Sequence, residues 1–240
     1  MYKRQTQSHA IIGGSLADKD DLVSASTVGL FTTRGQPFCT GTLITRNHVL
    51  TAAHCLQSGR DFLIGFGLNR SDIKFRRVKK FLSHKNFSPM EMKNNPDNPV
   101  NDIGLVELES SAPETHRSAL ILDQPMAAGD PLLLAGYGKT DFFNPDPRVA
   151  LRFVDTIFQE LHEASLEFTF GPTPGKSACQ GDSGGPAYFY DEVSDRVLLA
   201  GLTSRGMTGR VDELGRRIGC VGEGFYTDVQ AHFGWIVRNL

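Results

Sequence analysis

Short apolar or alternating runs recur along the chain, and turn signals separate them. The runs lie at 27–31, 38–44, 48–53, 62–66 and 103–108, and then at 132–137, 149–157, 186–190, 197–203 and 224–229. The 25 Gly and 12 Pro imply many turns and few long helices. No helical pattern alternates with the runs, as parallel β-α-β units would require. With the polar, unpatterned stretch 109–118 as a linker, the sequence predicts an all-β chain of two antiparallel barrels of about one hundred residues each.

The last dozen residues break this pattern. Apolar side chains recur there at helical spacing, at Val229, Phe233, Ile236, Val237 and Leu240. Asp228 precedes the first of them and can cap a helix. We predict an amphipathic helix over 229–240 that docks on a barrel, with Trp235 serving packing and not ligand binding.

Composition and charge exclude several classes of partner. The 240 residues contain 25 Lys and Arg against 27 Asp and Glu, a formal charge of −2. The chain therefore has no broad excess of positive charge that would favour binding to nucleic acid or to an anionic membrane. No apolar run approaches the 18 or so residues that a membrane span needs. We therefore expect neither a nucleic-acid partner nor a membrane span.

Residues 1–10 are polar and contain no apolar core of a signal peptide. Either the protein stays inside the cell or a targeting segment is missing from the sequence. The four cysteines favour the second alternative, and with it a secreted or periplasmic protein.

The cysteines are Cys39, Cys55, Cys179 and Cys220, and no C-x-x-C pair suggests zinc or thioredoxin chemistry. Four cysteines allow three disulfide connectivities, and the sequence alone does not choose among them. Local pairing, Cys39 with Cys55 and Cys179 with Cys220, is the simplest. The alternative is four buried thiols in a cytosolic protein.

The most informative segment is Cys-Gln-Gly-Asp-Ser-Gly-Gly-Pro at 179–186. Its glycines predict a tight turn that exposes the Ser183 hydroxyl and lets a substrate approach the main chain. Backbone N–H groups of Gly181 and Ser183 could hold the negative oxygen that forms when a carbonyl is attacked. The alternative for this segment on its own is a purely structural Gly-rich turn.

A serine hydroxyl needs a base, and the base needs an orienting group. Of the seven histidines, only His54 follows an apolar run in a setting of small residues, Val-Leu-Thr-Ala-Ala-His-Cys at 49–55. The other six fit surface or satisfied core positions. Asp102 opens the apolar strand at 101–107, where it is either a solvated strand end or a buried group held for a purpose.

Four motifs together carry a resemblance. Ile-Ile-Gly-Gly at 11–14, Thr-Ala-Ala-His-Cys at 51–55, Asn-Asp-Ile-Gly-Leu at 101–105 and Gly-Asp-Ser-Gly-Gly-Pro at 181–186 resemble the trypsin/chymotrypsin family of serine endopeptidases. The motifs stand in that family's order, histidine, aspartate and then serine, and they span nearly the whole chain.

The resemblance implies roles for these residues and an architecture. His54 would take the proton from Ser183 Oγ and later give it to the leaving amine, through an acyl-enzyme. Asp102 would fix the histidine tautomer and stabilise the imidazolium. The family's disulfides match the local pairing, and its fold implies two six-stranded barrels with the active site in the cleft between them. The mechanism requires no cofactor and no metal.

The resemblance also implies activation by cleavage. In the family a new N-terminal Ile places its ammonium against the Asp before the nucleophile, here Ile11 and Asp182. The chain as given would then be a zymogen, with 1–10 an activation segment or a remnant foreign to the domain. The bond before Ile11 follows Ala10, not the usual Arg or Lys, so an activating protease of another specificity or self-processing are both open.

The resemblance assigns the primary specificity pocket to six residues: Ser177, Ala178, Ser204, Arg205, Gly206 and Gly224. Its base, Ser177, is neutral, so the usual counter-ion for a substrate Arg or Lys is missing. Gly206 and Gly224 have no side chains and should leave the slot deep and open. We therefore expect a preference for large apolar residues before the scissile bond.

Two features depart from the family pattern. Arg205 replaces a usual aromatic residue, and Tyr137 replaces a usual tryptophan. The long loop 207–219 carries three arginines beside an Asp and a Glu. It predicts either a preference for acidic residues further along the substrate or a solvated charged loop.

These expectations divide the chain into the segment 1–10 and a peptidase domain at 11–240. The domain would comprise an N-terminal barrel at about 11–118, a C-terminal barrel at about 119–228 and a terminal helix at about 229–240. Its partners would be protein or peptide substrates and an activating protease, and we expect a monomer.

Two rival functions can be weighed. Gly181-x-Ser183-x-Gly185 also fits the nucleophile elbow of an α/β-hydrolase. In that fold the catalytic histidine follows the serine, and here only His232 does so. The alternation of strands and helices that the fold requires is also missing. A catalytically silent homologue acting as a binding protein would usually have lost one of the three reactive side chains, and here all three are present.

Overall fold

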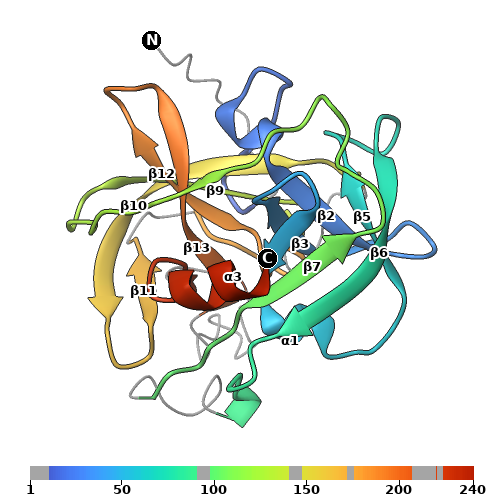
Figure 1. Ribbon diagram of the computed structural model, residues 1–240. Helices are drawn as coiled ribbons and strands as arrows, with labels where there is room; N and C mark the ends of the chain where they lie inside the picture. The colour runs from blue at the N-terminus through green and yellow to red at the C-terminus, as the bar shows by residue number, and fades with distance from the viewer. Residues whose placement is uncertain (1–10, 91–97, 141–147, 172–175, 207–219, 221–223) are drawn as a thin grey trace, which may run out of the picture.

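The computed structural model describes residues 11–90, 98–140, 148–171, 176–206, 220 and 224–240. Figure 1 shows two β-barrels side by side, the first in blue to green and the second in yellow to orange, with a short red helix in front of them. The predicted segment 1–10 and the charged loop 207–219 lie outside the described residues.

The first barrel is closed by six antiparallel strands in the order β2-β3-β4-β7-β6-β5. The strands are β2 (Thr27–Thr32), β3 (Pro37–Leu43), β4 (His48–Thr51), β5 (Phe62–Phe66), β6 (Lys74–Ser83) and β7 (Gly104–Leu108). Alternation along β2 shows how the barrel fills. Val28 and Leu30 are buried inside it, whereas Phe31 points to the other face and reaches the second barrel.

The second barrel closes in the same way, because β9 pairs with both β10 and β12. Its strands are β9 (Pro131–Gly136), β10 (Arg152–His162), β11 (Glu167–Phe170), β12 (Pro186–Asp191), β13 (Arg196–Gly206) and β14 (Gly224–Asp228). Two short strands attach to its outside. β1 (Ser15–Leu16) pairs with β10, and β8 (Leu120–Ile121) runs parallel to β13.

A shared apolar cluster joins the two barrels. Phe31 and Leu50 from the first barrel pack in the same buried cluster as Leu133 and Tyr188 from the second. The hydroxyl of the fully buried Tyr188 lies 2.7 Å from Ser26 Oγ, so its polar end is satisfied within the interface. The barrels therefore hold one another in a fixed position, which a site built from both of them needs.

The fold class predicted from the sequence is confirmed, with two six-stranded barrels and a C-terminal helix. To the ten predicted strands the structure adds β6 and β11 in the barrels and the two-residue β1 and β8 beside them. Two further helical turns are η1 (Leu22–Ala25) and α1 (Ala53–Leu56). In the described part of the chain, no helix has the length and apolar character needed to cross a bilayer.

The C-terminal helix is shorter than predicted, because α3 comprises Phe233–Asn239 only. Asp228 does not cap it. Its carboxylate instead accepts the N–H of Gln230 at 2.9 Å and stabilises a turn before the helix. Ile236 is buried in the apolar cluster that joins the two barrels. Trp235 packs against this cluster, in agreement with the packing role that the sequence predicted.

Candidate active site

His54 and Asp102 meet at the edge of the first barrel. His54 lies in α1, the single turn that follows β4, and Asp102 lies just before β7, the strand that pairs with β4. His54 Nδ1 is 2.8 Å from Asp102 Oδ2, and the His54 backbone N–H donates to Asp102 Oδ1 at 2.9 Å. A carboxylate only accepts, so Nδ1 carries the ring proton and Nε2 keeps its lone pair free to act as a base.

The carboxylate of Asp102 is fully buried and receives help from the second barrel. Ser204 Oγ donates to Oδ2 at 2.8 Å, and Thr227 Oγ1 donates to the Asp102 carbonyl at 3.0 Å. Asn101, just before it, adopts a left-handed φ of 52°, which asparagine tolerates, and His232 Nε2 lies 3.3 Å from Asn101 Oδ1. Both barrels therefore fix the acid that orients the histidine.

Ser183 lies in a turn that packs against the segment before His54. Gly184 has a φ of 75°, and a Cβ there would lie 2.1 Å from Thr51 Oγ1, so only glycine fits. Ser183 O accepts the N–H of Thr40 at 2.8 Å and lies 3.6 Å from Cys55 Sγ, next to His54.

Ser183 itself is partly exposed. Within the described residues it makes no hydrogen bond to the His54 ring. Such bonds are often long in ligand-free sites and tighten only when substrate is bound.

Two backbone N–H groups in the Ser183 turn have no acceptor among the described residues, and we call them the idle amides. In the described part of the chain, the N–H groups of Gly181 and Ser183 donate to nothing, whereas those of Asp182 and Gly184 are bonded within the fold. Gly181 has a φ of 100°, and a Cβ there would lie 2.8 Å from Gly138 Cα. Idle, preorganised donors next to a nucleophile are what an oxyanion requires.

The carboxylate of Asp182 is fully buried behind this turn. It accepts the N–H of Gly138 and the N–H of Cys179, each at 2.8 Å. Burial raises the pKa of Asp182 to about 7, although these two donors and the charge of Arg152 pull it the other way.

The predicted partner of Asp182, Ile11, is also buried. In the chain with residue 10 still attached, its nitrogen is an amide, and no described bond joins it to Asp182. Ile12 forms a backbone bridge with Ser177 instead, with N–H to O distances of 2.8 and 3.1 Å. The structure thus places Ile11 in the second barrel without showing the ion pair.

Four of the predicted pocket residues lie where the end of β13 pairs with the start of β14, namely Ser204, Arg205, Gly206 and Gly224. Ser177 is buried, and its hydroxyl donates to the Ala178 carbonyl at 3.1 Å. A Cβ at Gly206 would meet nothing within 4 Å, and one at Gly224 would lie 3.1 Å from the Arg205 carbonyl oxygen. The space beside Gly206 is therefore open among the described residues.

Arg205 does not project freely from the pocket wall. Its guanidinium makes a two-pronged ion pair with Glu167, with one bond of 2.9 Å to Oε2 and a second contact to Oε1. It also lies over the Phe225 ring, 4.1 Å from the centroid. The Glu167 side chain is fully buried, so its charge neutralises Arg205 at close range.

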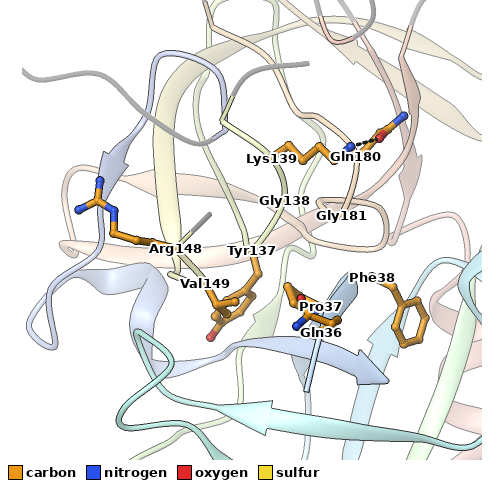
Figure 2. Close-up of a pocket in the computed structure, with 10 residues that line it drawn as sticks. All are labelled: Gln36, Pro37, Phe38, Tyr137, Gly138, Lys139, Arg148, Val149, Gln180 and Gly181. Carbon is orange, nitrogen blue, oxygen red and sulfur yellow. Dashed lines mark hydrogen bonds between the residues drawn. The ribbon is translucent and has the colours of Figure 1, made fainter. Parts of the chain in front are cut away.

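A cavity of about 390 Å³ lies beside Gly181, which is one of the residues that line it. Figure 2 shows Phe38 and Tyr137 on its lower side, and Lys139 reaching toward Gln180 on its upper side. Lys139 Nζ donates to Gln180 Oε1 at 2.8 Å, a neutral partner, and no carboxylate of the described residues pairs with this lysine.

Both disulfides have the expected local pairing. Cys39 is bonded to Cys55 and Cys179 to Cys220, and no free cysteine occurs among the described residues. The first bond ties β3 to the turn that carries His54, and the second anchors the segment before Ser183. Cys39, His54 and Cys55 cluster within 4.8 Å, but sulfurs in a disulfide cannot ligate a metal as thiolates.

Comparison with known proteins agrees with this geometry. The trypsin family model matches residues 11–236. The chain belongs to the trypsin family. It is a chymotrypsin-like serine endopeptidase, and the predicted family is confirmed.

Individual members of the trypsin family share only a minority of their residues with this chain. Trypsin epsilon of Drosophila erecta is 31% identical over 226 residues, covering 85% of this chain and 78% of the relative. Mannan-binding lectin serine protease 1 of Mus musculus is also 31% identical, over 85% of this chain, but the match spans only 32% of that longer protein. Mouse neuropsin, described as a serine protease expressed in the limbic system, has the same fold, with a TM-score of 0.73 and 20% identity over 94% of this chain and 98% of its own.

Several residues that shape this trypsin-family site had no signal in the sequence. Thr40 donates its hydroxyl to the Gly181 carbonyl at 2.8 Å and so fixes the peptide between Gly181 and Asp182, which lies between the two idle amides. Ser204 was expected only as a pocket wall, and Glu167 was not singled out. Each acts across more than thirty residues of sequence, where pattern alone gives no indication.

Proposed function

We propose that Ser183 is the nucleophile of this endopeptidase and His54 its general base, oriented by Asp102. The base takes the hydroxyl proton as oxygen attacks the peptide carbonyl carbon. It then gives that proton to the leaving amine, which departs as the acyl-enzyme forms. Water attacks the ester in the second half, again with His54 moving the proton, and Ser183 is regenerated.

The observation that carries this proposal is the pair of idle amides at Gly181 and Ser183, close to a histidine whose Nδ1 is committed to a buried carboxylate. Two such donors stabilise the oxygen that becomes negative in the transition state. Losing one donor typically costs about 3–4 kcal/mol of transition-state stabilisation.

We further propose that the chain is a zymogen activated by cleavage before Ile11. The φ of Ile11 is 41°, a left-handed value that costs a β-branched residue about 1–3 kcal/mol. This torsion no longer exists once the preceding peptide bond is cut, so cleavage relieves the strain. The new ammonium would then form a direct ion pair with the buried Asp182, whose carboxylate already interacts electrostatically with the buried Arg152. An activating protease or self-processing would perform the cut.

The pocket supports a preference for large apolar residues before the scissile bond. Its base is the buried, neutral Ser177, and its Gly206 side is open. Arg205 does not turn the acyl side of the cleft into an acid-binding surface, because Glu167 neutralises it. The cavity beyond Gly181 is suited to the part of the substrate that leaves with the amine.

We propose a secreted or periplasmic location, because both disulfides persist in oxidising compartments and are rare in reducing ones. The monomeric state stays a prediction.

The test compares the full chain with a chain cut before Ile11 through an introduced protease site. The cut form should hydrolyse a peptide with Phe before the scissile bond, and the full chain should be much slower. Faster cutting after Arg or Lys would refute the pocket assignment.

The same cut form tests the ion pair. A paired α-amino group has a pKa raised above its ordinary value of about 8. Activity should therefore be present at neutral pH and be lost as the pH rises through this raised pKa. Full activity after acetylation of the Ile11 amine would refute the activation mechanism.

A further inference from the structure

One buried cation has no part in the proposed reaction. Arg152 has one of the largest fully buried side chains in the described part of the chain, only 1% exposed, and it lies in strand β10. Burying a guanidinium is costly unless a negative charge lies near it, because the guanidinium gives up its hydration. A negative charge is therefore expected close to Arg152.

The strand register brings Arg152 close to the Asp182 carboxylate. Arg152 is paired with Gly136 in β9, the adjacent strand of the second barrel (Figure 1). Directly paired residues of antiparallel strands point to the same face of the sheet, with their Cβ atoms about 4.5–5.5 Å apart. A Cβ at Gly136 would lie 2.2 Å from Asp182 Oδ1. The carboxylate thus fills the space that the missing Gly136 side chain leaves, on the face that Arg152 shares.

This face also carries the residue that cleavage would turn into a new N-terminus. Leu134 lies two residues before Gly136 and shares its face, and Val154 lies two residues after Arg152. Both pack in one buried cluster formed by strands of the second barrel, and Ile11 packs in that cluster as well. The guanidinium of the uncleaved chain and the ammonium expected after cleavage therefore belong to the same part of the molecule.

The charge of Arg152 acts on Asp182 through space. Burial raises the pKa of Asp182 to about 7, and the positive charge of Arg152 opposes that rise together with the two backbone donors. Both side chains are fully buried, where a charge is screened far less than in water and acts over a longer distance. Arg152 therefore favours the charged form of the carboxylate.

The turn that contains Asp182 is ordered around this carboxylate while residue 10 is still attached. Asp182 accepts the N–H of Gly138 at 2.8 Å, and the idle amides of Gly181 and Ser183 flank it in the sequence. The ammonium of Ile11 does not exist in this chain. A positive charge that acts on Asp182 before cleavage has to come from elsewhere, and Arg152 supplies one.

We propose that Arg152 is a positioning residue that partly replaces the Ile11 ammonium before cleavage. It holds a charged Asp182 in place, and Asp182 in turn holds the turn that carries Ser183 and the idle amides. The uncut chain then has a basal endopeptidase activity, lower than that of the cut chain, that depends on Arg152. This proposal rests on the proposed roles of Ser183 and of the Ile11 ammonium.

The test measures kcat/KM on one peptide with Phe before the scissile bond, for the uncut and the cut forms of the parent and of Arg152→Gln. The assay runs at about pH 8, where Asp182 with a pKa of about 7 is charged. The substitution should lower kcat/KM of the uncut chain by about tenfold or more, which is within the range for two coupled sites. The cut form has the ammonium and should lose about threefold at most.

The ratio of cut to uncut activity is the decisive quantity, because a general loss of stability lowers both forms. It should rise about threefold or more in Arg152→Gln. Arg152→Lys keeps the positive charge and should keep most of the uncut activity. Intact mass spectrometry shows that the uncut chain stays uncut during the assay, and thermal midpoints show that each variant is folded.

The matched control is Arg46→Gln, which removes an equal charge from the first barrel. The Arg46 guanidinium donates to the carbonyls of Pro113 and His116, at 3.3 and 2.8 Å. This variant should leave the ratio of cut to uncut activity unchanged. The same rise in the control as in Arg152→Gln would overturn the assignment to Arg152.

Two further results would overturn the role of Arg152 and leave the proposed function standing. One is an unchanged ratio in Arg152→Gln, and the other is an uncut parent no more active than its Ser183→Ala variant. Activity of the cut chain that survives Ser183→Ala would instead refute the proposed function, and this inference with it.

Discussion

Ser204 Oγ donates a hydrogen bond of 2.8 Å to Asp102 Oδ2, the same oxygen that lies 2.8 Å from His54 Nδ1. The hydroxyl comes from the second barrel and the other two groups from the first. The acid that orients the histidine is therefore held by both halves of the molecule.

Replacement of Ser204 by Ala should lower kcat/KM roughly tenfold. The reason is that removing a hydrogen-bond donor from a buried carboxylate costs about 1–3 kcal/mol. Thr227→Val is the matched control, since its hydroxyl donates to the Asp102 carbonyl and not to the carboxylate. It should have the smaller effect on kcat/KM. The same loss in both variants would contradict a role for Ser204 through the carboxylate.

The buried Asp182 predicts how stability depends on pH in the uncleaved chain. Burial raises its pKa from 3.8 to about 7, so the folded state binds the proton more tightly than the unfolded state does. This contribution to stability is complete below about pH 4 and is lost by about pH 7, a change of up to about 4 kcal/mol. Denaturant unfolding at several pH values measures it.

Asp182→Asn provides the comparison, because its amide does not titrate. The difference in unfolding free energy between the parent and this variant should change with pH between 4 and 7. A constant difference would mean that Asp182 is already ionised in the uncleaved chain. Cleavage before Ile11 should reduce the slope, because the new ammonium favours the charged carboxylate.

Gly181→Ala should abolish most activity. A Cβ there meets Gly138 Cα at 2.8 Å, so the turn has to shift and its idle amide moves. The loss should be about a hundredfold or more in kcat, as for removal of an oxyanion donor. Gly129→Ala is the matched control, because its φ of 97° is similar and its Cβ meets nothing within 4 Å. Kinetics on one peptide should show near-normal kcat for the control.

Breaking the ion pair between Glu167 and Arg205 should lower the unfolding free energy far more than breaking a surface ion pair does. Glu167→Gln leaves a mostly buried arginine unpaired, and we expect it to lower the unfolding free energy by about 3–5 kcal/mol. Lys176→Gln breaks the pair with Asp155, whose side chain is 79% exposed, and should cost less than about 1 kcal/mol. Urea unfolding measures both, and similar costs would contradict the importance of burial.

The sequence predicted the strands with clear apolar alternation and the residues with local motifs around them. It missed β6, because five basic residues among seven hide the period-two pattern. It missed β11 because four residues are too few to show a period. Asp228 was expected to cap the helix, but its carboxylate is used one turn earlier, by Gln230.

Long-range partners were beyond the sequence for a different reason. The bonds from Ser204 to Asp102 and from Arg205 to Glu167 depend on how strands pair in space, and many partners would fit the same residues. The idle amides of Gly181 and Ser183 were expected from the glycine pattern. Thr40, which fixes the peptide between Gly181 and Asp182, could be found only from the structure.

The most direct test of the account is the reaction of the chain, cut before Ile11, with a serine-directed phosphonylating reagent, followed by peptide mass spectrometry. We predict a single adduct on Ser183, formed at least a hundredfold more slowly when His54 is replaced by Ala. An unlabelled Ser183, or labelling at an unchanged rate without the imidazole, would contradict it.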